Sequence, residues 1–208
     1  ITFRAEDEIA AAAASVGASF TGKLAVTGTS GPGLALKSET ISLALSAELP
    51  LVVVNVQRGG PSTGLPTKPE QSDLMFALYG RHGESPLPVV AAKSPSHAFY
   101  AAFEASRIAL KYMTPVILLS DNYVATGSEP WNLPDTDGLN DLDTNIITKL
   151  NTEDGFLPFL RNVDTFARPW ALPGTPGLEY RVGGLEKEEG TGNVSYDSAN
   201  HQYMTDMR

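Results

Sequence analysis

Cysteine is absent from the 208 residues, and this absence excludes several chemistries at once. Without thiols these residues form no disulfide scaffold, no thiolate zinc site and no cysteine nucleophile, and they hold no iron–sulfur cluster by themselves. A cysteine-free chain is compatible with the reducing cytoplasm, and we expect a cytoplasmic location.

Basic clusters and long apolar runs are missing as well. The chain has 24 acidic and 15 basic residues, a formal net charge of −9, and no group of lysines and arginines marks a nucleic-acid-binding face. No apolar run reaches the ~20 residues of a membrane helix. We therefore expect no nucleic acid and no membrane as partner. The opening segment Ile1–Arg4 has no initiator methionine and no signal-peptide core, so we expect the natural protein to extend beyond both ends.

Short apolar runs alternate with helical stretches over residues 1–128. We predict strands at 24–27, 51–56, 87–91 and 116–119, and helices at 6–20, 34–48, 70–78 and 95–113. The strand at 51–56 is apolar except at Asn55, and such a nearly continuous run is typical of a strand buried on both faces. This alternation predicts an α/β fold, a parallel sheet with helices on both faces, whose ligands gather at the carboxyl ends of the strands.

Residues 129–208 differ from residues 1–128 in charge and in pattern. They carry 14 acidic and 6 basic residues, against 10 and 9 in residues 1–128, and they are rich in proline and glycine. Five large aromatic residues make them too hydrophobic for a solvated tail: Trp131, Phe156, Phe159, Phe166 and Trp170. We predict a domain at 1–128 and an irregular, acidic connecting arm at 129–208 that packs on another surface, which we expect to be another subunit.

Three segments with unusual chemistry follow predicted strands, at 29–33, 58–67 and 121–123. In the first, Gly31-Pro32-Gly33 imitates a dinucleotide fingerprint, but Leu36 stands at the third glycine position and no acid ends the next strand. A dinucleotide site is therefore weakly supported, and a tight strand-to-helix turn explains the glycines equally well.

The second segment is glycine-lined and begins with Arg58. Gly59 and Gly64 have the spacing of a phosphate loop, but Leu65-Pro66 replaces the lysine and hydroxyl residue that bind phosphate and magnesium. The guanidinium is a rigid fork for a carboxylate or a phosphate, so we favour an anion pocket over a solvated surface loop.

The remaining polar groups have ordinary explanations. The three acids at 6–8 suit the start of a helix, where the dipole favours negative charge. The three histidines are scattered, and neither a nucleophile elbow nor a calcium loop occurs in the sequence. We therefore assign no metal ligand to this chain.

Taken together, the acidic helix start, the 29–33 segment and the apolar strand resemble the pyrimidine-binding domain of thiamine-diphosphate enzymes. More specifically, residues 4–128 resemble the α subunit of 2-oxoacid:ferredoxin oxidoreductases, above all of the 2-oxoglutarate type. The segments that carry the resemblance lie at 5–11, 29–33 and 55–68, and in the arm at 168–177 and 183–186.

The resemblance implies a cofactor and a role for five residues. Thiamine diphosphate would lie between this domain and a partner, and Glu8 would be the catalytic acid that hydrogen-bonds its aminopyrimidine N1′. Ser30 and Gly31 would lie near the cofactor. Arg58 and Thr67 would bind the carboxylate and the oxo group of the substrate.

The resemblance also implies partners, because parts of the family pattern are missing from these residues. A Tyr-Pro-Ile-Thr-Pro segment before the glutamate helix, a domain after the arm and a magnesium signature are not found. A β subunit would therefore supply Mg²⁺, the diphosphate site and a [4Fe-4S] cluster. The implied reaction converts 2-oxoglutarate and coenzyme A to succinyl-CoA and carbon dioxide, with electrons passing to ferredoxin. Two alternatives stay open: a pyruvate or branched-chain 2-oxoacid enzyme of the same family, and a non-catalytic assembly or regulatory module.

Overall fold

A sheet of four parallel strands forms the centre of the fold in a computed structural model. The structure describes residues 1–62, 64–65, 67–139 and 142–208. Thr63 and Pro66 of the glycine-lined segment, and residues 140 and 141 of the acidic arm, lie outside the described residues. The strand order is β1-β2-β4-β3, with bounds β1 (Ala25–Thr29), β2 (Leu51–Gln57), β3 (Val89–Ala91) and β4 (Pro115–Asp121).

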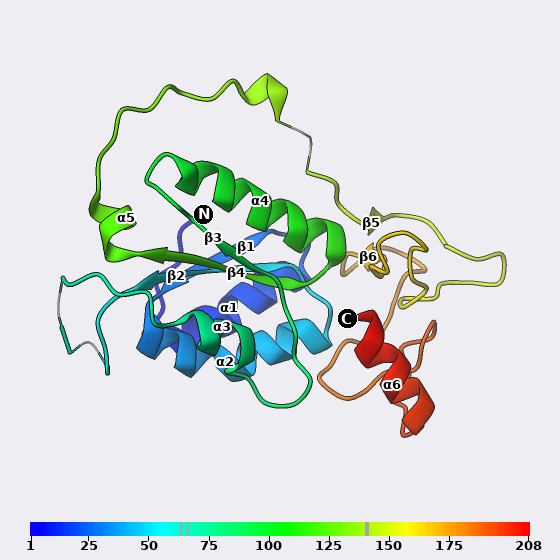
Figure 1. Ribbon diagram of the computed structural model, residues 1–208. Coiled ribbons are helices and arrows are strands. Elements are labelled where there is room, and N and C mark those ends of the chain that lie inside the picture. Colours follow the sequence, from blue (N-terminus) through cyan, green and yellow to red (C-terminus); the bar gives the residue numbers. More distant parts are fainter. Residues whose placement is uncertain (63, 66, 140–141) are drawn as a thin grey trace.

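Helices cover both faces of this sheet (Figure 1). On one face lie α1 (Glu8–Phe20), α2 (Gly31–Ser46) and α3 (Leu74–Tyr79), and on the other lies α4 (His97–Tyr112). The predicted fold class, a parallel sheet with helices on both faces, is confirmed.

Alternate residues of the central strands supply the two halves of the core. Leu51 and Val53 of β2 pack toward α2, whereas Val52 between them packs toward the alanine-rich face of α4. All three are at most 1% exposed. Burial on both faces explains why β2 has no polar alternation in its first half.

The register brings the carboxyl ends of β1, β2 and β4 to one edge of the sheet. Thr29 pairs with Asn55, and Gln57 pairs with Asp121. From that edge the chain continues into α2, into the segment that begins with Arg58, and into a short helix α5 (Asn122–Thr126). The three unusual segments of the sequence therefore meet at one edge, as predicted.

Two helix predictions have wrong boundaries, each for a local reason. The helix expected at 34–48 begins at Gly31, so that Gly31-Pro32-Gly33 forms its first turn with proline at an early helical position. The helix expected at 70–78 is only α3, because the polar residues before it bind across the sheet edge: Asp73 donates its backbone N–H to the Gln57 side chain at 2.9 Å.

The arm at 129–208 is largely irregular, as expected, but no sequence pattern predicted its ordered parts. Its described residues contain a 3₁₀ turn (Thr136–Gly138), two paired short strands β5 (Ile146–Ile147) and β6 (Trp170–Ala171), and the helix α6 (Ser198–Met207). Its later part lies at the end of the sheet opposite α5 (Figure 1).

The expectation that the arm packs on another subunit is wrong for its buried aromatic core. Trp170 is 0% exposed and lies in one cluster with Leu110 and Met113, at the end of α4. Phe159 is also fully buried. Two of the five aromatic residues of the arm are thus buried within this chain, whereas Trp131 and Phe166 stay 43% and 50% exposed.

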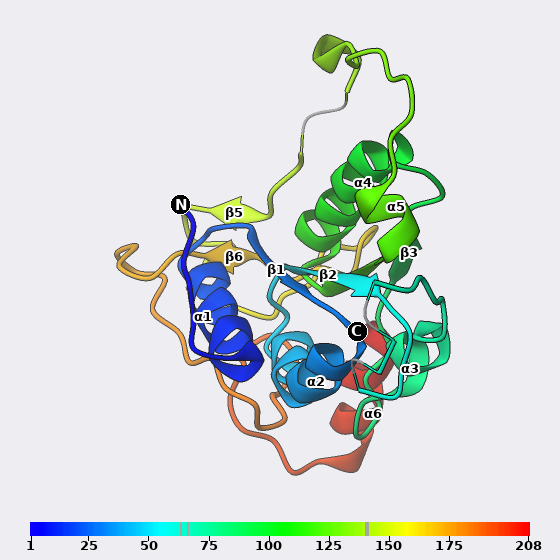
Figure 2. The ribbon, with the colours of Figure 1, turned by 90° about the vertical axis from the view of Figure 1, so that its left-hand side faces the viewer.

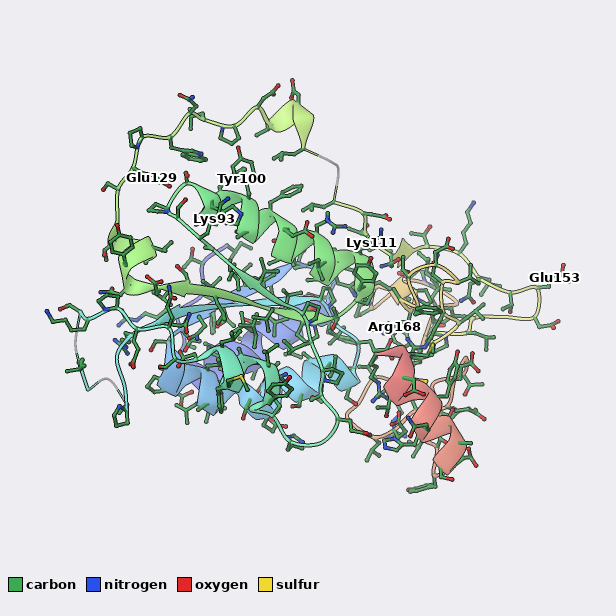
Figure 3. All side chains as sticks on the ribbon, in the orientation of Figure 1. Lys93, Tyr100, Lys111, Glu129, Glu153 and Arg168 are labelled. Atoms are coloured by element: carbon green, nitrogen blue, oxygen red, sulfur yellow. The ribbon has the colours of Figure 1, made fainter. Side chains whose placement is uncertain are left out.

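A buried polar junction fixes the arm to the turn before β2. Arg161 forms an ion pair with Glu48 at 2.6 Å, and both side chains are nearly inaccessible. Arg168, labelled in Figure 3, donates to the carbonyl of Ala47 at 3.2 Å and stacks against the Phe159 ring. No helix in the described part of the chain has the length and apolar character needed to cross a membrane.

Candidate active site

Glu8 occupies the first turn of α1, where local sequence fixes its position. Asp7 caps the helix by accepting a hydrogen bond from the Ala10 backbone N–H at 2.8 Å. The cap satisfies one amide of the helix start and leaves Glu8 as the first helical residue. Its side chain lies against the first turn of α2, which is beside α1 (Figure 2).

Gly33 makes room for that side chain. A Cβ at position 33 would lie 2.0 Å from Thr29 Oγ1 and 2.7 Å from Glu8 Cγ. Only glycine allows this approach, so the second glycine of Gly31-Pro32-Gly33 is explained by the packing of Glu8 on the first turn of α2.

Glu8 faces a cleft of about 300 Å³ at the carboxyl edge of the sheet. The structure brings Glu8, Ser30 and Arg58 together here, although they come from three different segments of the chain. The lining consists of Glu8, Thr29, Ser30, Val56, Arg58 and Asn122.

The two charged groups of this cleft, the Glu8 carboxylate and the Arg58 guanidinium, take no part in the hydrogen bonds among the described residues. No hydrogen bond to the Glu8 carboxylate or from the Arg58 guanidinium is formed with the described residues, and Arg58 Nε is buried without a partner among them. A buried donor without a partner is costly, so these groups are suited to bind a ligand.

A larger open groove of about 740 Å³ adjoins the cleft, and Arg58 lines both. Gly31 and Asp73 lie on its wall. A Cβ at Gly31 would lie 3.0 Å from both carboxylate oxygens of Asp73, which accepts a hydrogen bond from Asn55 Nδ2 at 2.9 Å. Gly31 is thus beside the site, but its immediate neighbour is an acid that sequence reasoning did not single out.

Thr67 does not line either cavity. Thr67 is exposed, and its backbone has a left-handed conformation, with φ of 63°. Its carbonyl accepts a hydrogen bond from Asn122 Nδ2 at 2.8 Å, and Asn122 is a residue of the cleft. Thr67 therefore lies next to the cleft, and its role as a substrate-binding residue stays a prediction.

Asn122 binds the end of the glycine-lined segment through the Thr67 carbonyl, and Asp121 beside it binds Gln71, which follows that segment; neither was assigned a role from sequence. Asp121 is 3% exposed, accepts from Gln71 Nε2 at 2.5 Å and caps α5 through the Val124 amide. Burial alone would raise the pKa of Asp121, but these hydrogen bonds hold it below its usual value. The available signal was the polar segment directly after a buried strand.

The described residues contain no group of three or more histidine, aspartate or glutamate side chains placed to hold a metal ion. The chemistry of the cleft is instead that of one carboxylate and one guanidinium, flanked by Ser30 and Asn122. Such a site can hold a polar heterocycle by its carboxylate and an anionic group by its guanidinium.

Comparison with known proteins decides the family. The pyruvate flavodoxin/ferredoxin oxidoreductase family, in its thiamine diphosphate-binding region, matches residues 1–194. The chain belongs to this family. The resemblance stated from the sequence is thereby confirmed, and it extends from the domain through most of the arm.

Two relatives are similar over all or most of the chain. The 2-oxoglutarate oxidoreductase subunit KorA of Mycobacterium tuberculosis is 54% identical over 208 residues, which are 100% of this chain and 31% of that protein. The 2-oxoglutarate synthase subunit KorA of Archaeoglobus fulgidus is 48% identical over 62% of this chain and 37% of its own length.

A solved relative has the same fold. The 2-oxoglutarate:ferredoxin oxidoreductase from Magnetococcus marinus, with 2-oxoglutarate, coenzyme A and succinyl-CoA bound, matches with a TM-score of 0.89 and 40% identity. The match covers 98% of this chain and 35% of that one. The chain thus spans about a third of the length of these family members.

Proposed function

We propose that this chain supplies the pyrimidine-side half of the active site in the α subunit of a thiamine-diphosphate-dependent 2-oxoglutarate:ferredoxin oxidoreductase. The reaction would convert 2-oxoglutarate and coenzyme A to succinyl-CoA and carbon dioxide. The proposal rests on one observation: Glu8 and Arg58 line the same cleft, and neither charged group has a hydrogen-bond partner among the described residues.

The residues of the cleft fit thiamine diphosphate. Glu8, held over Gly33, would hydrogen-bond the aminopyrimidine N1′, and Ser30 would lie beside the ring. The bound cofactor supplies a carbon nucleophile for the 2-oxo group. The work of this chain is to keep the Glu8 carboxyl oriented at N1′ and to exchange a proton there, which general acid–base catalysis requires.

Arg58 fits a substrate carboxylate. It lies between the cleft and the open groove, so its fork faces the route by which a 2-oxo acid would reach the cofactor. Thr67, at the end of the same segment, would contact the oxo group. The relatives named for 2-oxoglutarate favour that substrate over pyruvate or a branched-chain 2-oxo acid.

The complete enzyme needs a partner. We assign Mg²⁺, the diphosphate site and a [4Fe-4S] cluster to a β subunit and the acceptor role to ferredoxin, because the 208 residues have no cysteine and the described lining of their cleft offers a single carboxylate, that of Glu8. The similar proteins are named as subunits, which supports a multi-subunit assembly. Since coenzyme A and ferredoxin are the proposed co-reactants, we expect the assembly to lie in the cytoplasm.

The experiment is an anaerobic purification of the full-length protein from its own cells through an affinity tag. We expect a brown partner with bound thiamine diphosphate and coenzyme A-dependent viologen reduction that is fastest with 2-oxoglutarate. Higher activity with pyruvate or a branched-chain acid would reassign the substrate. A colourless, inactive single chain would contradict the proposal and favour a non-catalytic module.

A further inference from the structure

Lys37 of α2 carries an amine that is completely buried. The residue is 0% exposed, yet the described residues offer it only two hydrogen-bond acceptors. Lys37 Nζ donates to Thr27 Oγ1 at 2.9 Å and to the main-chain carbonyl of Glu8 at 3.2 Å. A buried ammonium is expensive to desolvate, so a site that holds one with few partners calls for an explanation.

The explanation lies in the spacing of Lys37 and Gly33. The two positions are four residues apart on α2, so they share one helix face. Gly33 contacts the side chain of Glu8, and Lys37 binds the backbone of the same residue. One face of α2 therefore fixes Glu8 at two points.

The charges around Lys37 are consistent with these two contacts. Burial lowers the pKa of Lys37, and the carboxylates of Glu8 and Asp7 oppose that effect. The amine thus lies within the field of the acid that faces the cleft. If Lys37 only filled space, an apolar side chain of the same length would fill it equally well.

We propose that Lys37 is a positioning residue for Glu8: by holding the Glu8 carbonyl, it fixes the first turn of α1 so that the carboxylate faces the cleft. The proposal rests on the proposed function for the identity of the group that Glu8 meets there, the aminopyrimidine of thiamine diphosphate.

The test is a Lys37→Met variant of the full-length α subunit, assembled with its partner. Methionine fills a similar volume without a charge or a donor. We expect the Kd for thiamine diphosphate, measured by titration of the cofactor-free complex, to rise about tenfold and kcat to fall up to 100-fold, since small misplacements of catalytic groups have effects of this size. The Tm of the cofactor-free complex should not fall, because a costly buried charge is removed.

Lys187 provides a matched control. It is 3% exposed and donates to the carbonyls of Gly183 and Leu185, both at 2.9 Å, and burial lowers its pKa to about 8. It belongs to the arm and lines neither of the two site cavities. Lys187→Met removes an equivalent buried ammonium, and we expect wild-type Kd and kcat from it.

Three outcomes overturn the inference. The first is a Lys37→Met enzyme with the cofactor Kd and the kcat of the wild type. The second is a Lys187→Met enzyme that loses as much cofactor affinity and turnover as Lys37→Met, and the third is a Tm of Lys37→Met that falls in proportion to its activity. If Lys37→Met does not assemble, Lys37→Gln, which retains a donor, is measured against the same limits. A Glu8→Gln variant separates the proposals: if it loses function while Lys37→Met does not, only the role of Lys37 is wrong, and if it keeps full function the proposed function is wrong too.

Discussion

At the residue scale, the site depends on charged groups that the fold leaves free for a ligand. Arg58 is the clearest case, because none of its guanidinium nitrogens donates to a described residue. Arg161 and Arg168 also have a buried Nε without an acceptor, but their terminal nitrogens are bound: Arg161 forms an ion pair with Glu48, and Arg168 donates to two backbone carbonyls. The difference marks Arg58 as a binding group and the other two as structural groups.

Arg58→Ala should raise the KM for 2-oxoglutarate in the assembled enzyme. A charge-assisted hydrogen bond contributes about 1.5–3 kcal/mol, which corresponds to a KM roughly 10- to 150-fold higher. Arg58→Lys keeps the charge but loses the fork, so its KM should be intermediate. The control is Arg107→Ala, which removes a surface pair with Glu104. Steady-state kinetics with a KM unchanged by Arg58→Ala would remove Arg58 from the substrate site.

Sequence reasoning identified residues at this scale when a local pattern carried them. Glu8, Ser30 and Arg58 were predicted from motif segments, and the structure places all three on one cleft. Lys37 and Asn122 were missed, because their contacts reach residues 29 and 55 positions away. No local pattern predicts such distant partners.

At the element scale, the turn from β1 into α2 builds the wall on which Glu8 rests. Two glycines of one turn have different tasks: Gly31 faces the Asp73 carboxylate, and Gly33 faces Glu8 and Thr29. The sequence showed the glycines but not their neighbours. The dinucleotide and the tight-turn interpretations therefore described the backbone of the turn but not the side chains that pack against its glycines.

Gly33→Ala should damage the site through packing. The added Cβ would approach Thr29 Oγ1 to 2.0 Å, so Thr29 and Glu8 must both move, at a cost of about 1–3 kcal/mol of stability. We expect a lower Tm and weaker binding of thiamine diphosphate. Gly17→Ala is the matched control in α1, where a Cβ meets nothing within 4 Å, and it should stabilise by about 0.5–1 kcal/mol. Equal effects of the two substitutions would contradict the packing argument.

Asn122→Asp should loosen the glycine-lined segment. The carboxylate no longer donates to the Thr67 carbonyl, which now receives its hydrogen bond at 2.8 Å, and it repels that oxygen. We expect the KM for 2-oxoglutarate to rise by up to about tenfold, in line with the loss of one exposed hydrogen bond and the repulsion that replaces it. The control is the neighbouring Tyr123→Phe, a change on an exposed ring, which should keep wild-type kinetics. An identical KM in both variants would show that the hydrogen bond from Asn122 to Thr67 does not support substrate binding.

At the scale of the whole molecule, the later part of the arm and the site occupy opposite ends of the sheet (Figure 1). The arm is fixed at the amino ends of the strands through Trp170, Phe159 and the Glu48–Arg161 pair. The sequence showed that the arm must bury its aromatic residues but not where. That choice depends on a surface formed by the end of α4 and the turn before β2, which exists only in the folded chain.

Trp170→Ala should lower stability by about 3–5 kcal/mol, because it empties a fully buried ring position. Trp131→Ala, at a position 43% exposed, should cost much less. Thermal unfolding of the assembled protein compares the two, and KM should stay unchanged in both because neither ring lines the cleft. A Trp170→Ala variant as stable as Trp131→Ala would show that the arm does not anchor on this domain.

The turnover of the assembled Glu8→Gln enzyme decides whether Glu8 is the acid of a thiamine-diphosphate site. Glutamine keeps the shape and the packing over Gly33 but cannot exchange the proton. We expect kcat for coenzyme A-dependent oxidation of 2-oxoglutarate to fall by roughly 10²–10⁴, the usual contribution of general acid–base catalysis, with no loss of Tm. A kcat equal to that of the wild type would contradict the account and leave Glu8 as an ordinary acid at the start of a helix.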